Sequence, residues 1–555
     1  MSVFAATAAE RIMEDESLTA DQRALYLVYS VIEPENLPAE YTMNAEPALC
    51  GTPALHEAML LEDQISQATL DRILTLANRP TLSGPETTFI SPAGYFRFHY
   101  TTSGGDAVTE AYANEMAGYF DDSWEMEINI LGYFQPPSDN GLGGDNLYDV
   151  YIQTLSGGTL GYTTSAGEYK PPDSTHSCSA SHIVMNTNLG YNYLTTTSSH
   201  ELQHAVQMSY DYEEPTWFME NCAVNMEDLV FPDVNDWLGF WGEGGVRKPW
   251  LSIDTGNPYW YGSSMWPRMM GLLFGNEAIR EVWENCAAEN GPNMWDAIDD
   301  MFIAHGMDFE SGFMTYGLWR YFTGPNYNEL YNLWDPDLDL PASGPPFLVG
   351  HNISSLPASG DQGAVYPPEF TGIHWIRVKL ENYQNGWVQF EFDGRDNWDF
   401  NLGVFLFNET SFQFDWYDIE GPDNIFTVGV PTTGWDWAVF FPANMYDSSL
   451  NGNYDFTASY TSGIEEGETL EGAGLSVQQN PMTTGSAVSF SLPGSGHADL
   501  SLVDLTGRRV STIFSGPAEQ GIHSIEFQGG IASGTYFVVL RHGNAIEAQR
   551  VSVLR

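Results

Sequence analysis

His200-Glu201-Leu202-Gln203-His204 places two histidines four residues apart, with a glutamate beside the first of them. On a helix, residues i and i+4 share a face, so both imidazoles can ligate one metal ion while Glu201 acts on water as a general base. Ser198 and Ser199 are candidates to cap the start of this helix, and Glu213-Glu214-Pro215 is a candidate for its end. The stretch therefore predicts a helix that carries a zinc site.

Zinc at such a site needs a third protein ligand. The pattern HExxHxxGxxH fails, because position 207 is Gln and position 210 is Tyr. Glu220 is the better candidate. It lies in Thr216–Ala223, the start of a second predicted helix that begins after Pro215. A helix, a turn and a second helix would bring Glu220 back across the two histidines.

Other carboxylates nearby are candidates for supporting or alternative roles at the metal. Glu227 lies seven residues after Glu220, so it shares a helix face with it and can hydrogen-bond a ligand histidine. Asp211 and Asp228 are the alternative third ligands of an aspzincin-like site, in which an aspartate completes the metal centre.

The order HExxH, Trp217-x-x-Glu220 and a second glutamate seven residues later resembles the gluzincins, such as the aminopeptidase N family. The resemblance implies that His200, His204 and Glu220 bind zinc and that Glu201 is the general base. Fifteen residues separate His204 from Glu220, fewer than in the best-known gluzincins, and Asn221 stands where aminopeptidases have Gly. The exopeptidase signature Gly-x-Met-Glu-Asn is missing, which favours an endopeptidase acting on proteins or peptides.

Residues 88–335 also resemble a family of secreted bacterial metalloproteases. The matching pieces are Ser91–Tyr100, Gly143–Tyr151, His200–Gln207 and Phe231–Asp236. A peptidase of this kind needs a donor for the oxyanion, and Pro258-Tyr259-Trp260-Tyr261-Gly262 is similar to the Pro-Tyr-x-x-Gly segment that supplies it in aminopeptidase-like gluzincins. Tyr259 is the closer match and Tyr261 the second candidate.

Leu49-Cys50-Gly51-Thr52-Pro53 partly resembles the cysteine switch of matrixin propeptides, in which a thiolate fills the open zinc position. Cys50 is therefore a candidate latency thiol. A disulfide and a buried free thiol are the alternatives. The four cysteines, Cys50, Cys178, Cys222 and Cys286, are compatible with one or two bridges whose pairing the sequence does not define.

The chain has 19 basic and 74 acidic residues, a net charge of -55. Such a surface repels nucleic acid and anionic lipid, so neither is an expected partner. No run of 18 apolar residues is present, which argues against a membrane-spanning helix. We expect a monomer. Asp145 with Asp149, or Asp393 with Asp396, are candidates for structural Ca²⁺, and solvated acidic faces are the alternative.

Changes of pattern along the 555 residues predict several domains. Residues 1–85 have helical spacing and form a possible propeptide. Residues 86–340 have strands before helices, which predicts an α+β zincin-like domain with a mixed-sheet lobe and a helical lobe. In residues 345–462, apolar and polar residues alternate in short strands, which predicts a jelly-roll-like β-sandwich. The composition of residues 463–473 predicts a linker. Residues 474–555 again alternate in short strands, which predicts an Ig-like sandwich.

Residues 474–555 resemble the carboxyl-terminal sorting domain of type IX secretion substrates. The matching residues are Gln479–Pro481, Val488–Pro493, Leu502–Val510, Gly521–His523 and Ala532–Leu540. The resemblance implies contact with secretion machinery and a secreted or outer-membrane surface-attached protein. The start, MSVFAATAAE, lacks the regions of a signal peptide, so we expect that a leader was removed.

Two functions are compatible with these patterns. The first is a secreted zinc endopeptidase. The second is a non-catalytic surface adhesin or glycan-binding protein whose zinc site is structural or vestigial. The two predicted sandwiches favour the second function, and the intact Glu201 favours the first, because a structural site needs no general base.

Overall fold

The computed structural model describes residues 6–323, except 173 and 290, and most of residues 350–553. The gaps in the second range are 362–365, 410, 420–422, 448–451, 463–473, 478–481, 493, 504–508, 532–533 and 543–544. The expected boundary between residues 340 and 345 and the expected linker at 463–473 thus lie outside the described residues. The chain divides into unit 1, Met1–Arg247 with Asp254–Asp308, and unit 2, Lys248–Ile253 with Phe309–Arg555.

Unit 1 begins with five helices, in the region where the sequence predicts helices. They are α1 (Ala8–Glu14), α2 (Ala20–Val31), α3 (Ala39–Thr42), α4 (Thr52–Leu60) and α5 (Gln67–Leu76). Thr7 and Thr19 each form a capping box with the residue three positions on, which satisfies backbone donors at the starts of α1 and α2. The apolar faces of these helices meet in one core that includes Leu27, Leu55 and Ile73.

A five-stranded mixed sheet follows. Its strands are β1 (Glu86–Ile90), β2 (Phe96–Thr101), β3 (Tyr148–Gln153), β4 (Gly161–Thr164) and β5 (His182–Asn186). The order is β1-β2-β3-β5-β4. The three central strands are parallel, and the two edge strands pair antiparallel to their neighbours. Strand β4 is therefore an edge strand.

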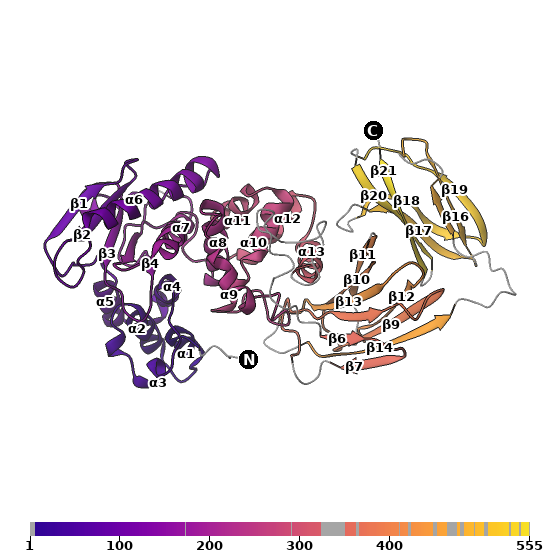
Figure 1. Ribbon diagram of the computed structural model, residues 1–555, viewed down its shortest axis with the longest axis horizontal. Helices are drawn as coiled ribbons and strands as arrows, with labels where there is room; N and C mark the ends of the chain where they lie inside the picture. The colour runs from indigo at the N-terminus through magenta and orange to yellow at the C-terminus, as the bar shows by residue number, and fades with distance from the viewer. Residues whose placement is uncertain are drawn as a thin grey trace. The chain divides into compact units, whose positions relative to one another are not determined.

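Both faces of this sheet are covered, because side chains along each strand alternate between two cores. Val150 and Ile152 face α6 (Glu110–Trp124) and α7 (Tyr191–Gln207), whereas Tyr151, between them, joins the core of the N-terminal helices. Figure 1 shows α6 and α7 on one side of the sheet and α2, α4 and α5 on the other. The N-terminal helices are thus one layer of the α/β region.

Helix α7 begins earlier than the sequence predicts. Ser198 and Ser199 lie inside it, and Gly190 is its N-cap. Helix α6 continues into a π-helical turn, Glu125–Ile130. The α-helices of unit 1 that follow α7 are α8 (Thr216–Val230), α9 (Tyr259–Gly262), α10 (Met265–Phe274), α11 (Glu277–Ala288) and α12 (Met294–Ala304). Helix α8 begins after Pro215, as predicted, and ends before Phe231.

Unit 2 consists of α13 (Phe309–Tyr321) and all-β sheets. One sheet has the order β11-β10-β13-β8-β6 and another the order β12-β9-β14-β7. The strands are β6 (His351–Ile353), β7 (Ala358–Asp361), β8 (Ile376–Lys379), β9 (Gly386–Gly394), β10 (Phe400–Phe407), β11 (Phe412–Ile419), β12 (Ile425–Pro431), β13 (Trp437–Asn444) and β14 (Tyr454–Ser462).

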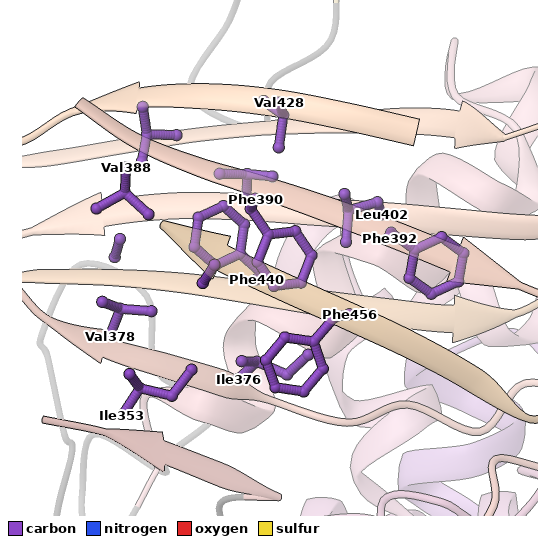
Figure 2. Packing of buried hydrophobic residues seen from close by; sticks show 14 of the residues in the cluster. Ile353, Ile376, Val378, Val388, Phe390, Phe392, Leu402, Val428, Phe440 and Phe456 are labelled. Atoms are coloured by element: carbon purple, nitrogen blue, oxygen red, sulfur yellow. The ribbon is translucent and has the colours of Figure 1, made fainter. Parts of the chain in front are cut away.

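The two sheets share one core, drawn in Figure 2. Phe390 of β9 and Phe440 of β13 come from different sheets and stack with ring centroids 4.1 Å apart. The burial of β9 alternates strictly along its length, which is the pattern expected of a strand with one face on a core.

The last part of unit 2 contains a three-stranded and a four-stranded sheet around a further core. Their orders are β15-β16-β19 and β18-β17-β20-β21. The strands are β15 (Gly474–Val477), β16 (Ala487–Leu492), β17 (Gly496–Val503), β18 (Arg509–Ala518), β19 (Gly521–Glu526), β20 (Gly534–His542) and β21 (Ala545–Val553). Among the described residues, no helix is long and apolar enough to cross a membrane.

Candidate metal centre

Helices α7 and α8 bring the predicted ligands together. His200 and His204 project from the same face of α7, with ring centroids 4.8 Å apart. Glu220 of α8 faces both rings: Oε2 lies 3.3 Å from His200 Nε2, and Oε1 lies 3.1 Å from His204 Nε2. His204 and Glu220 are fully buried, and His200 is 5% exposed. The three residues predicted from spacing thus form one cluster.

The Nδ1 atom of each imidazole lies within hydrogen-bonding distance of a side-chain oxygen. Glu227 Oε1 lies 2.6 Å from His200 Nδ1, and Gln207 Oε1 lies 2.9 Å from His204 Nδ1. Gln207 Nε2 in turn donates to the Met219 carbonyl of α8. These contacts place the proton on Nδ1 and leave each Nε2 lone pair free for a metal. The sequence predicts the role of Glu227 but misses Gln207, although its position three residues after His204 was a usable signal.

Cys50 completes the group. Its Sγ lies 3.5 Å from His204 Nε2, and one ligand atom each from Cys50, His200, His204 and Glu220 all lie within 4.8 Å of one another. A tetrahedral zinc with bonds of about 2.0–2.3 Å sets its ligand atoms roughly 3.3–3.6 Å apart, which matches the shorter separations here. This buried group can therefore hold a metal ion.

The hydrogen bonding of the cluster also fits the binding of a cation. His200 Nε2 and both Glu220 carboxylate oxygens are buried without a hydrogen-bond partner. Buried polar atoms are seldom left in this state. Burial alone would raise the pKa of Glu220, but His204 and His200 outweigh it and lower that pKa to about 2. The ligand carboxylate is thus held in its charged form.

Glu201 lies beside the cluster and is fully buried. Its Oε2 accepts hydrogen bonds from Thr52 Oγ1 at 3.0 Å and from Thr163 Oγ1 at 2.8 Å, and its Oε1 lies 3.3 Å from Cys50 Sγ. Neither threonine was singled out from the sequence. Thr163 gives no local signal, whereas Thr52 is part of the Cys50 stretch.

The two candidate tyrosines, Tyr259 and Tyr261, differ in their position relative to the cluster. The Tyr261 ring lies 6.3 Å from the ring of His200, and Tyr261 lines the two cavities beside the cluster. Burial, together with Glu220 and Cys50, raises the pKa of Tyr261 well above its usual value, so its hydroxyl remains a donor. Tyr259 is buried in the same short helix but lines neither of these cavities.

The aspartates proposed as alternative ligands lie elsewhere. Asp228 accepts hydrogen bonds from Trp237 Nε1 at 2.9 Å and from Arg268, and Asp211 Oδ1 accepts from the Glu213 backbone at 2.8 Å. Neither belongs to the buried group. Glu220, and neither aspartate, lies where a third metal ligand is expected.

The calcium candidates Asp145 and Asp149 contact basic side chains of the protein. Asp145 pairs with Arg97, and Asp149 pairs with Arg79 and with His99. Both carboxylates thus engage side chains of the protein, and neither belongs to the potential metal-binding group found among the described residues, so Ca²⁺ at these two residues stays a prediction. Asp393 and Asp396 line an open cavity together with Asp455, and this cluster falls outside the one potential metal-binding group found among the described residues.

The cysteines form no disulfides. Cys50, Cys178, Cys222 and Cys286 are all free and buried. The one or two bridges that the sequence allows are therefore not present, and Cys50 is available as a thiol.

Two cavities flank the cluster. A small one, of about 30 Å³, is lined by Leu49, Thr197 and Phe240 among others. A larger one, of about 390 Å³, is lined by Pro53, Trp217 and Trp295 among others. Cys50 and Tyr261 belong to the walls of both.

Comparisons with known proteins add little. No protein-family model and no curated protein matches the chain. Among solved structures, a protein described as a β-galactosidase from Bacteroides fragilis has a TM-score of 0.12 and 11% identity over 32% of each chain. The BSP domain of a biofilm-associated protein has a TM-score of 0.13 and 9% identity over 36% of this chain and 51% of that one.

A β-1,2-glucanase from Parabacteroides distasonis has a TM-score of 0.13 and 6% identity over 36% of each chain. This chain thus spans between a third and about half of the length of these structures. At such TM-scores the likeness carries no weight for fold or function, so the function is inferred from the metal centre itself.

Proposed function

We propose that this protein is a zinc-dependent endopeptidase of the gluzincin type, with His200, His204 and Glu220 as the metal ligands. The observation that carries the proposal is the position of Glu201. A buried carboxylate stands next to a ligand set of two histidines and a glutamate, on the same helix. A site that only stabilised the fold would have no need of it.

The chain's own groups can carry out the proton transfers of peptide hydrolysis. When bound, zinc supplies Lewis acidity, which favours ionisation of water and polarises a carbonyl group. Glu201 would accept a proton from the attacking water and deliver it to the leaving amine. Tyr261 would donate a hydrogen bond to the carbonyl oxygen as negative charge develops on it.

The test is cleavage of casein by zinc-loaded protein, with Glu201→Gln as the informative variant. The change keeps the shape of the side chain but removes the base, so we expect activity to fall at least about a hundredfold while zinc content is unchanged. Glu289→Gln, at an exposed position after α11, is the matched control. Because Cys50 is a candidate latency thiol, the three samples, wild type, Glu201→Gln and a chelated sample, are compared both with Cys50 present and in a Cys50→Ala background. Equal activity of all three in both backgrounds would exclude the proposal.

A second function is favoured by one specific observation. Four protein groups surround the candidate metal position, and a closed ligand shell is typical of structural zinc. A non-catalytic adhesin or glycan-binding protein with a structural site would show this geometry. Glu201 argues against that function, and the role of Cys50 decides between the two.

For the last part of the chain we propose a sorting role in type IX secretion, and hence an extracellular or surface-attached protein. The support is the spaced set of matching residues, part of which lies on strands β16, β17 and β20. The test is export of the protein from its native host with and without residues 474–555. Undiminished export of the truncated protein would exclude the role.

A further inference from the structure

We propose that Leu49–Thr52 is an internal inhibitor that closes the metal centre, with Cys50 as the fourth metal ligand. The inference rests on the proposed function, because it assigns a regulation to the same site. It predicts that the intact chain is latent and that withdrawal of this segment exposes the zinc to substrate.

The backbone of the segment is held on the sheet. Leu160 N–H donates to the Leu49 carbonyl at 2.8 Å, and Gly51 N–H donates to the Gly161 carbonyl at 3.0 Å. Cys50 pairs with Gly161 in a parallel bridge. Since β4 is an edge strand, the segment occupies hydrogen-bonding groups that would otherwise be open to an incoming extended peptide.

Side chains of the segment contact both the proposed metal ligands and the proposed general base, Glu201. Cys50 Sγ lies in the ligand group, where a thiolate is a strong zinc ligand. The Thr52 hydroxyl donates to Glu201 Oε2 at 3.0 Å and accepts from the Thr163 backbone at 2.8 Å. One short segment thus supplies a fourth metal ligand and also donates a hydrogen bond to the general base.

The cavities indicate what the segment excludes. Leu49 and Cys50 line the smaller cavity, whereas Cys50 and Pro53 line the larger one. The segment therefore lies between the two cavities, and its withdrawal would join them across the metal. A groove that continues on both sides of a metal suits an extended chain cut in its interior, which is the substrate of an endopeptidase.

Packing explains why the segment stays in place. The segment ends in the first residue of helix α4, and α4 belongs, with α2 and α5, to the core that includes Tyr151, Tyr162 and Val184 of the sheet. The exposed stretch 42–47 precedes it, broken only by the half-buried Ala45. The segment is thus tethered to a packed layer on one side and to an exposed loop on the other.

The first test is spectroscopic. Zinc-edge X-ray absorption of the wild-type protein should show one sulfur in the metal shell, and the Co²⁺-substituted protein should show a thiolate-to-cobalt band in the near ultraviolet. The band should be lost in Cys50→Ala and kept in Cys178→Ala, a cysteine outside the ligand group. A shell of nitrogen and oxygen only, or an unchanged band in Cys50→Ala, overturns the proposal.

The second test is casein cleavage by the same zinc-loaded proteins. We expect Cys50→Ala to be at least about tenfold more active than the wild type, because the competent state is no longer a minor one. Equal activity of the two without sulfur ligation would leave the peptidase in place and exclude the inhibitor. Sulfur ligation with no activity in either protein would exclude the peptidase and the inhibitory role, leaving a structural four-ligand site.

Discussion

At the scale of single residues, Tyr261 and Tyr259 offer a direct comparison, since they lie in the same four-residue helix. The Tyr261 ring lies beside the ring of His200 and lines both cavities, so Tyr261→Phe should lower kcat for peptide cleavage about a hundredfold with zinc affinity unchanged. Tyr259→Phe should retain near wild-type kcat. Steady-state kinetics on a single peptide, measured in the Cys50→Ala background, decides the matter. A larger loss in Tyr259→Phe would reverse the assignment.

Gln207 positions His204, one of the proposed metal ligands, and lies outside the proposed ligand set. It accepts from His204 Nδ1 and is tied to α8 through Met219. We expect Gln207→Leu to weaken zinc binding by about 10- to 100-fold, as measured by competition with a chromophoric chelator.

Gln203 is the matched control for Gln207, because it is also buried in α7 but both of its amide atoms lack a hydrogen-bond partner. Gln203→Leu should leave zinc affinity unchanged. An equal loss in both variants would mean that general packing of α7, and no specific hydrogen bond, sets the affinity.

Asp211 should make stability depend on pH. Burial raises its pKa from 3.8 to about 7, with neighbouring Glu214 and Glu213 adding to the effect, although the Glu213 backbone donates to it. Between these pKa values the folded protein holds a proton that the unfolded chain has lost, so the contribution of Asp211 to stability falls as pH rises. Asp211→Asn mimics the protonated acid. It should gain stability relative to the wild type at pH 8 but not at pH 4.

Urea unfolding of metal-free protein at the two pH values measures this difference. Asp139→Asn is not a suitable control, since Asp139 pairs with Arg79. The Glu289→Gln variant serves instead, and its stability relative to the wild type should be the same at both pH values. A constant difference for Asp211→Asn as well would contradict the expectation.

At the scale of elements, the closeness of β4 to α7 sets the geometry of the centre. A methyl group added at Gly161 would lie 3.1 Å from Glu201 Cγ, Thr197 Cγ2 and Met185 Sδ. Gly161→Ala should therefore cost about 1–3 kcal/mol in the free energy of unfolding and should displace Glu201. Gly118→Ala, in α6 with open space around it, should be neutral or stabilising. Chemical denaturation of both variants tests this. Equal effects would show that the β4–α7 contact can adjust.

The start of α7 shows where local sequence rules fail. Thr195, Thr196 and Ser198 argue for a helix boundary by propensity. In the structure their hydroxyls bond to carbonyls of the preceding turn, at 3.0, 2.9 and 2.7 Å, and the residues pack inside unit 1. Burial thus outweighs propensity. The spacing of HExxH and of the Glu220 helix was predictable, because it depends on helical periodicity alone.

At the scale of the whole molecule, the changes of pattern along the chain predicted an α+β domain followed by two β-sandwiches. The structure has an α/β region with a mixed sheet, followed by all-β sheets. That order of helices and strands was predictable because helical and strand periodicities are local properties. The contact of Cys50 with His204 joins positions 154 residues apart. No periodicity encodes such a contact, and only a partial motif resemblance pointed to it. Sequence periodicity likewise does not encode the contact of Thr163, a residue of strand β4 whose hydroxyl donates a hydrogen bond to Glu201.

The metal should stabilise one part of the chain selectively. Every ligand belongs to unit 1, whereas the β-sheets of unit 2 have cores of their own. A ligand that binds only the folded state adds about 2.7 kcal/mol at a concentration of 100 Kd. In calorimetry, added zinc should therefore raise the Tm of one transition and leave another in place. His204→Ala should abolish the shift, because it removes a ligand from the buried group. A shift that persists in this variant would place the bound zinc elsewhere, on one of the acidic surfaces that a net charge of -55 provides.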